Sequence, residues 1–215
     1  GKDGFDSTAS SKPVEAYSNN LKFNRKIRIA YIKECIESPG LNEEIRKRLM
    51  EIIETLRKEG HTVEEIDFPY LDYLVPCYYM LTTAEASSNL ARFDGVRYGK
   101  RSPNATDIES CYKKSRTEGF GKEVQRRIML GTFVLSAGYY DAYYSKAQKV
   151  RRIVRDKTNE ILSDHEFIIL PTTPHPAIPL GQKVNDPVAM YLEDIFTVQA
   201  NLTGLPSISL PLGNH

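Results

Sequence analysis

A strand, a helix and a second strand near the N-terminus constrain the fold most strongly. Residues 26–32 alternate apolar and polar side chains with a period of two, which predicts a strand. A helix follows, with apolar residues at spacings of three and four: Ile45, Leu49, Ile52, Ile53 and Leu56. Asn42 can cap this helix and Gly60 can end it. Residues 62–68, stopped by Pro69, predict the next strand, so parallel pairing through a right-handed crossover is expected.

The remainder of the chain is predicted to be mainly helical. Residues 73–163 have helical periodicity, with an interruption at Gly138. Residues 167–170 form an unbroken apolar run, which is typical of a strand buried on both faces. The proline-rich residues 171–187 predict a loop, and a final strand is expected around Ile208 and Leu210.

Composition argues against several classes of partner. The chain has 29 Lys+Arg against 28 Asp+Glu, so no strong field favours nucleic acid or an anionic membrane. No apolar run approaches the roughly 20 residues needed to cross a bilayer. The three cysteines have no metal or disulfide spacing, and we expect reduced thiols in a cytoplasmic protein: Cys35, Cys77 and Cys111.

Spacing alone defines no catalytic centre or metal site. The chain contains neither a phosphate-binding GxGxxG or GxxxxGK[ST] motif nor a GxSxG nucleophile elbow. Its histidines are scattered singly, and each is predicted to be solvated: His61, His165, His175 and His215.

Three polar strings stand out, and the residues alone favour a structural interpretation of each. Residues 85–95 are predicted to begin a helix that packs through small side chains, and residues 119–127 to lead from a loop into a helix. Four tyrosines interleave with basic residues, a pattern that can stack RNA bases but more often forms a solvated helix face. They are Tyr139, Tyr140, Tyr143 and Tyr144, followed by Lys146, Lys149, Arg151 and Arg152.

These strings carry a resemblance to a known family. EASSNLARFDGVRYGKR (85–101), SRTEGFGKEVQRRIMLGTF (115–133) and SAGYYDAYYSKAQKVR (136–151) resemble the A subunits of glutamyl-tRNA(Gln) amidotransferases, which belong to the amidase signature family. The opening residues 1–8 are similar to the segment that follows the catalytic core of those subunits. The resemblance covers nearly the whole chain in order.

The resemblance implies an activity and partners. The A subunits hydrolyse glutamine and pass ammonia to the B subunit of the enzyme, which amidates misacylated Glu-tRNA(Gln) with ATP and Mg²⁺. The C subunit completes the heterotrimer, and tRNA is contacted indirectly through the B subunit. No cofactor or metal is expected in this chain itself.

The chain also departs from the family pattern. The family's catalytic lysine, bridging serine and nucleophilic serine lie in a Gly/Ser-rich signature, and no GSS or SGG run occurs in residues 1–215. We therefore expect the triad upstream, in a longer protein, and no catalytic residue here. The resemblance implies three glutamine-binding residues, Tyr78, Arg127 and Asp194. A guanidinium suits an α-carboxylate, and a carboxylate suits an α-ammonium.

The expected fold is α/β, part of the amidase signature fold with a mixed β-sheet covered by α-helices. The whole chain, 1–215, would be a partial domain: a loop (1–20), a strand–helix–strand unit (21–70), a mainly helical part (71–165), and strands and loops (166–215). Two alternatives remain open, a stand-alone amidase of the same family and a non-catalytic module that docks a partner protein or tRNA.

Overall fold

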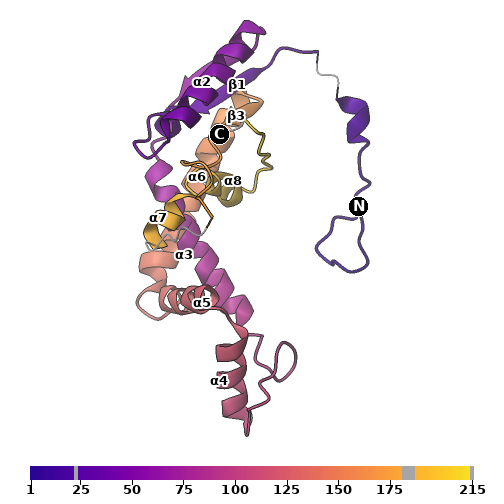
Figure 1. Cartoon of the computed structure of the whole chain (residues 1–215), viewed down its shortest axis with the longest axis vertical. Coiled ribbons are helices and arrows are strands. Elements are labelled where there is room, and N and C mark those ends of the chain that lie inside the picture. The colour runs from indigo at the N-terminus through magenta and orange to yellow at the C-terminus, as the bar shows by residue number, and fades with distance from the viewer. Residues whose placement is uncertain (22–23, 181–186, 214–215) are drawn as a thin grey trace.

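A small parallel sheet lies at one end of the molecule (Figure 1). The computed structural model describes residues 1–21, 24–180 and 187–213. Its three strands are β1 (Arg28–Ile32), β2 (Thr62–Ile66) and β3 (Phe167–Ile169), in the order β2-β1-β3. Both pairings are parallel. The α/β class is confirmed, whereas the three strands of the described residues are all parallel rather than mixed.

Helix α2 (Glu43–Lys58) connects β1 to β2 and follows the predicted pattern. The side chain of Asn42 accepts hydrogen bonds from the backbone amides of Glu44 and Ile45, as an N-cap does. Gly60 has φ +90, a conformation that glycine adopts without strain, and it turns the chain into β2. The predicted strand–helix–strand unit with parallel pairing is therefore confirmed.

The central strand β1 is covered on both faces. Ile29 and Tyr31 pack on the side of α2, in a cluster that includes Leu49 and Ile53. Ala30 and Ile32 point the other way, into a larger cluster with residues of the C-terminal half. A strand with alternating residues in two cores must lie in the middle of the sheet, which agrees with its position between β2 and β3.

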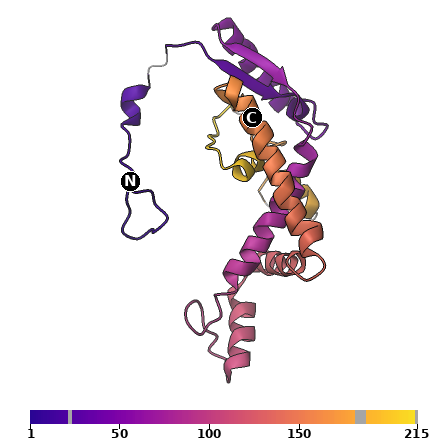
Figure 2. The same cartoon turned by 180° about the vertical axis from the view of Figure 1, so that it is seen from behind.

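Two long helices cover the second face of the sheet, α3 (Leu71–Leu90) and α6 (Lys146–Asp164). Between them in the sequence lie α4 (Ile108–Gly119), α5 (Lys122–Val134) and a π-helical segment η2 (Tyr140–Ser145). Helices α3 and α6 contact each other and extend from the sheet, α5 crosses the far half of α3, and α4 projects at the opposite end (Figures 1 and 2). The predicted interruption at Gly138 is confirmed, because this residue has φ +86 between α5 and η2.

Shorter elements complete the chain. They are η1 (Tyr17–Asn20), α1 (Lys33–Ile36), α7 (Pro187–Leu192) and α8 (Val198–Thr203). Helix α8 packs on α3 and α6, and the Arg151 guanidinium donates through Nε to the carbonyl of Leu202 at 2.8 Å. The N-terminal residues up to η1 run apart from the main body (Figure 2).

Helices α3 and α5 cross closely at a glycine. A Cβ atom on Gly131 would lie 1.9 Å from the carbonyl oxygen of Thr83 and 2.7 Å from the Cβ of Ser87. The hydroxyls of Ser87 and Thr132 lie 2.9 Å apart across the same crossing. This close approach fixes the position of α5 against α3.

Several sequence predictions need correction. Residues 85–90 end α3 instead of beginning a helix. Strand β3 forms as predicted, but the prediction that it is buried on both faces is wrong, because Phe167 is 55% exposed and no residue of the β3 strand is fully buried. Ile208 and Leu210 are exposed and form no strand, because their segment pairs with none of the three strands of the described residues. The predicted loop is confirmed for residues 171–180, and residues 181–186 lie outside the described part.

The cysteines are buried thiols. Cys35, Cys77 and Cys111 are free and each is at most 4% exposed. Burial raises the pKa of the Cys35 thiol to about 12 and that of Cys77 to about 11. In the described ranges, no His, Cys, Asp or Glu group of three or more could hold a metal ion, and no helix has the length and apolarity to cross a membrane.

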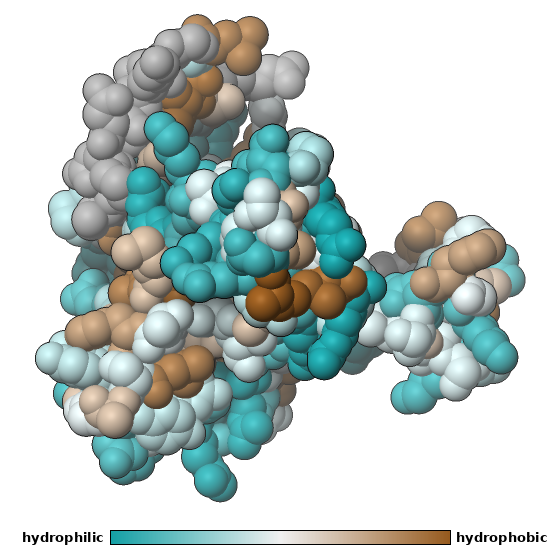
Figure 3. Space-filling view, turned by 90° about the horizontal axis from the view of Figure 1, so that it is seen from below, coloured by the Kyte–Doolittle hydropathy of each residue, from teal (hydrophilic) through white to brown (hydrophobic). Residues whose placement is uncertain are grey.

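Apolar side chains are also exposed at the surface. In the view from below, apolar patches interrupt the hydrophilic surface on the main body and on the separate N-terminal segment (Figure 3). Large exposed side chains of α5 and η2 and of the turn between them include Met129, Phe133, Tyr139, Tyr140 and Tyr143.

Candidate functional site

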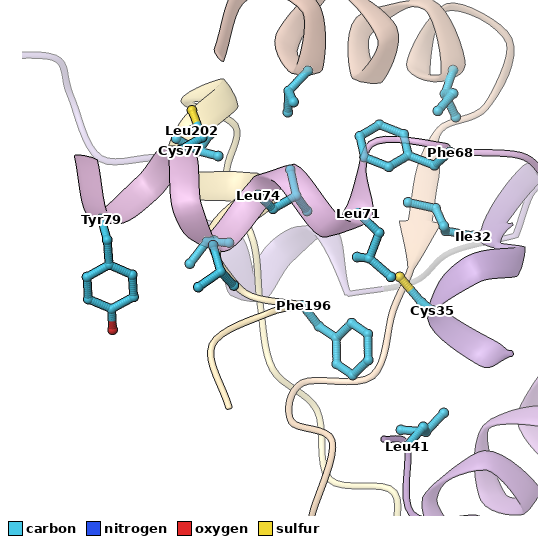
Figure 4. Close-up of a cluster of buried hydrophobic side chains, with 14 of the residues drawn as sticks. Ile32, Cys35, Leu41, Phe68, Leu71, Leu74, Cys77, Tyr79, Phe196 and Leu202 are labelled. Carbon is cyan, nitrogen blue, oxygen red and sulfur yellow. The ribbon is translucent and has the colours of Figure 1, made fainter. Parts of the chain in front are cut away.

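A buried tyrosine of α3 defines the candidate site. Tyr79 is 8% exposed, and its hydroxyl donates a hydrogen bond to Oδ2 of Asp194 at 3.0 Å. Its hydroxyl points away from the apolar side chains of the core, such as Leu74 and Leu71 (Figure 4). Tyr79 therefore stands at the border between the core and a polar cluster.

A guanidinium lies on the face of the same ring. The Cζ atom of Arg127, on α5, is 5.4 Å from the centroid of the Tyr79 ring, a cation–π distance. Nε of Arg127 donates to Oε1 of Glu123 at 3.0 Å. Glu123 precedes Arg127 by one helical turn, so the pair lies on one face of α5.

A second tyrosine closes the cluster. The ring of Tyr191, on α7, lies 4.2 Å from that of Tyr79, centroid to centroid. Its hydroxyl donates to Oε1 of Glu123 at 3.1 Å. Elements far apart in the sequence thus meet in one group of side chains: Tyr79, Glu123, Arg127, Tyr191 and Asp194, called the polar cluster below.

The contacts within the polar cluster shift the pKa values of Tyr79, Glu123 and Arg127. Burial, with the hydrogen bond to Asp194, raises the pKa of the Tyr79 phenol to about 12, so Tyr79 remains a donor. Burial alone would favour the protonated form of Glu123, but hydrogen bonds from Arg127 and Tyr191 lower its pKa. The hydrogen bond to Glu123 raises the pKa of Arg127. At neutral pH Tyr79 is therefore a neutral phenol, and Glu123 and Arg127 carry opposite charges.

Two of the three predicted site residues belong to the polar cluster. Arg127 and Asp194 both reach Tyr79, although they are distant in the sequence. The third, Tyr78, lies next to Tyr79 with the two rings edge to face at 5.4 Å. Tyr78 packs its side chain against the larger core cluster. Its role as a glutamine-binding group stays a prediction.

Sequence reasoning missed three members of the polar cluster. Tyr79 is adjacent to the residue that the resemblance indicated. Glu123 stands four residues before Arg127 and Tyr191 three residues before Asp194, so helical spacing could have suggested both. No local signal could have shown that these pairs share one tyrosine ring.

The tyrosines of residues 139–144 form aromatic contacts with one another and with Phe133 at the surface. Tyr139 and Tyr143 contact Phe133 at centroid distances of 4.4 and 5.7 Å, and Tyr140 contacts Tyr144 at 5.1 Å. The rings therefore pack on one another beside α5.

One histidine departs from the sequence prediction. The prediction that all histidines are solvated is wrong for His165, which is buried with Nε2 3.1 Å from Oε2 of Glu64. The reason is its position, because it closes the end of α6 above the sheet. His215 lies outside the described residues.

The polar cluster brings opposite charges to one tyrosine. A guanidinium over the ring face and a carboxylate at the hydroxyl can receive a ligand that carries both an anionic and a cationic group. Its tyrosines donate hydrogen bonds and orient the charged groups. None of the five side chains is a serine, cysteine or lysine paired with a base, and their charged and hydroxyl groups can hold and orient a ligand.

The sequence matches known proteins over its whole length. A family model described as amidase matches residues 1–215. The chain is 50% identical over 214 residues to the A subunit of glutamyl-tRNA(Gln) amidotransferase from Brevibacillus brevis, covering 99% of this chain and 44% of that protein. It is 49% identical over 215 residues to the protein of the same name from Koribacter versatilis, covering 100% and 45%. The chain thus spans less than half the length of these relatives.

Solved structures share the fold. The A subunit of glutamyl-tRNA(Gln) amidotransferase from Thermotoga maritima matches with a TM-score of 0.58 and 39% identity, over 83% of this chain and 33% of that one. A bacterial aryl acylamidase of the amidase signature enzymes matches with a TM-score of 0.61 and 18% identity, over 89% and 38%. At 18% identity the second similarity establishes the fold alone.

Proposed function

Because this chain belongs to the amidase family, whose model matches all of residues 1–215, we propose that it is the glutamine-recognising part of the A subunit of a glutamyl-tRNA(Gln) amidotransferase. The relatives of that name, about half identical over the whole chain, support this. The full-length protein would hydrolyse glutamine in the cytoplasm, and the ammonia would convert Glu-tRNA(Gln) to Gln-tRNA(Gln) for translation.

The division of labour follows from the residues present. The chain contains no Gly/Ser-rich signature, so the Ser-Ser-Lys triad would be supplied by the remaining length that the relatives possess. The B and C subunits would be its partners, with tRNA bound through the B subunit. ATP and Mg²⁺ would be used by the B subunit, and this chain would bind neither.

One observation carries the proposal: Arg127 lies over the ring face of Tyr79, and Asp194 accepts the hydrogen bond from the hydroxyl of the same residue. Free glutamine has an α-carboxylate and an α-ammonium, and the two charged side chains match them. Asp194 uses one oxygen for Tyr79 and keeps lone pairs for an ammonium. Arg127 uses Nε for Glu123, and in the described part of the chain no hydrogen bond occupies its terminal nitrogens.

The charged pair also discriminates between amide substrates. An aryl or alkyl amide has no charged α-groups, so it would leave Arg127 and Asp194 with desolvated, unmatched charges. Glutamine satisfies both at once. The polar cluster therefore favours glutamine over the apolar amides that a stand-alone amidase of the same fold could accept.

The test is made in the assembled heterotrimer containing the full-length protein. Arg127→Ala and Asp194→Asn should each lower kcat/KM for glutamine by about ten- to a hundredfold, as expected for the loss of one charge-assisted hydrogen bond. Amidation with added ammonia should be unchanged, because ammonia bypasses the glutaminase site. Normal glutamine use by both variants would refute the proposal, and loss of both activities would indicate a folding role instead.

A further inference from the structure

The carboxylate of Glu123 contacts both Arg127 and Tyr191 of the polar cluster. Oε1 of Glu123 accepts Nε of Arg127 at 3.0 Å and the hydroxyl of Tyr191 at 3.1 Å. The other oxygen, Oε2, pairs with Nη1 of Arg126, which is exposed on the outer side of α5. Glu123 itself is half-buried. Glu123 therefore accepts hydrogen bonds from three side chains and is not a freely solvated surface charge.

The contact to Nε limits how Arg127 can bind a carboxylate. A guanidinium forms a fork with a carboxylate either through its two terminal nitrogens or through Nε and one terminal nitrogen. Glu123 occupies Nε, so the second arrangement is blocked. The plane of the guanidinium is further held over the ring of Tyr79, at 5.4 Å. Only the end-on fork is left for a ligand.

The hydrogen bond from Tyr191 links Glu123 indirectly to Asp194, the other carboxylate of the polar cluster. Tyr191 packs its ring on Tyr79 at 4.2 Å, and Tyr79 donates its hydroxyl to Asp194. Tyr191 and Asp194 are also one helical turn apart, and the amide of Asp194 donates to the carbonyl of Tyr191 at 3.3 Å. Replacing Glu123 would therefore alter the position of the Arg127 side chain directly and that of Asp194 through Tyr191.

From this geometry we propose that Glu123 is a positioning residue for the glutamine α-carboxylate, which holds Arg127 in the end-on orientation and sets its spacing from Asp194. The inference rests on the proposed function. Glu123 does not touch the substrate in this arrangement. It acts through Arg127 and Tyr191, and its effect should appear in substrate affinity and not in the chemical step.

The experiment compares variants of Glu123 in the assembled heterotrimer. Glu123→Ala removes the acceptor of the hydrogen bonds from Arg127 and Tyr191. Glu123→Gln keeps the shape of the side chain but replaces the charged carboxylate with a neutral amide. Arg126→Ala is the matched control, because it removes only the exposed partner of Oε2. Three quantities are measured: KM and kcat for glutamine, the rate with added ammonia, and the inhibition constant of L-glutamine α-amide, which lacks the α-carboxylate.

Glu123→Ala should raise KM for glutamine by about tenfold while kcat changes by less than about twofold. Glu123→Gln should give a smaller increase, and Arg126→Ala none. The ammonia-dependent rate should stay unchanged in all three. The inhibition constant of the α-amide should rise much less than KM for glutamine, because the α-amide makes no carboxylate fork with Arg127 and depends on Glu123 only through Tyr191 and Asp194. A purely structural role would not separate glutamine from its α-amide.

The outcomes distinguish this inference from the proposed function. If Arg127→Ala impairs glutamine use but Glu123→Ala does not, the positioning role is wrong and the proposed function stands. If neither variant changes KM, both are wrong. If Glu123→Ala and Glu123→Gln lose the ammonia-dependent activity as well, Glu123 supports the fold and the positioning role is overturned.

Discussion

The hydroxyl of Tyr79 donates a hydrogen bond to Asp194 at 3.0 Å, which joins the middle of α3 to the turn before α8. The same ring carries Arg127 on its face and Tyr191 at 4.2 Å. Three segments that are separate in the sequence therefore depend on one phenol for their relative placement. This makes Tyr79 the most informative residue for experiment.

Tyr79→Phe removes the hydroxyl and keeps the ring. Asp194 then loses the hydrogen bond that positions its carboxylate. We expect KM for glutamine in the assembled enzyme to rise several-fold, as for the loss of one hydrogen bond to a charged group. Tyr78→Phe is compared with it, because the sequence resemblance predicts that Tyr78 binds glutamine, whereas the structure packs Tyr78 on the core with an edge contact to Tyr79. A larger effect at Tyr78 would instead support the residue that the sequence resemblance indicated.

Alkaline pH should reduce the stability of the chain. The Tyr79 pKa is raised from 10.0 to about 12 in the folded state, so between these values the unfolded state loses the proton first. Stability is then fully present below about pH 10 and falls as the pH rises through about 12. Tyr79→Phe should flatten this part of the curve, measured by urea unfolding at pH 9 to 11. An unchanged slope would show that Tyr79 ionises normally.

Gly131→Ala should disrupt the crossing of α3 and α5. The added Cβ would meet the Thr83 carbonyl oxygen at 1.9 Å, so the helices must separate at a cost of about 1–3 kcal/mol or more. Gly121→Ala is the control, because a Cβ there meets nothing within 4 Å. Chemical denaturation of both variants decides it. Equal stability of the two would mean that the crossing is looser than the structure indicates.

The chain by itself should release no ammonia from glutamine above background. The polar cluster contains no serine, and the sequence contains no Gly/Ser-rich signature to supply a nucleophile. A glutaminase assay on the purified chain tests this. Turnover that disappears when a serine within residues 1–215 is replaced would contradict it.

Local sequence determined much of the fold. The alternation in residues 26–32, the Asn42 cap and the turn at Gly60 each act within a few residues, so the first two strands and α2 were predictable together with their parallel pairing. The resemblance to amidases likewise indicated Arg127 and Asp194 before any geometry was known.

Tertiary packing decided what local pattern could not. Tyr78 and Tyr79 are neighbours on α3, about 100° apart around the helix axis, and only the packing of α3 against α5 and α8 selects the one that faces Asp194. Glu123 and Tyr191 converge for the same reason. Ile208 and Leu210 have strand propensity but remain exposed, because propensity alone does not make a strand and their segment pairs with none of the three strands of the described residues.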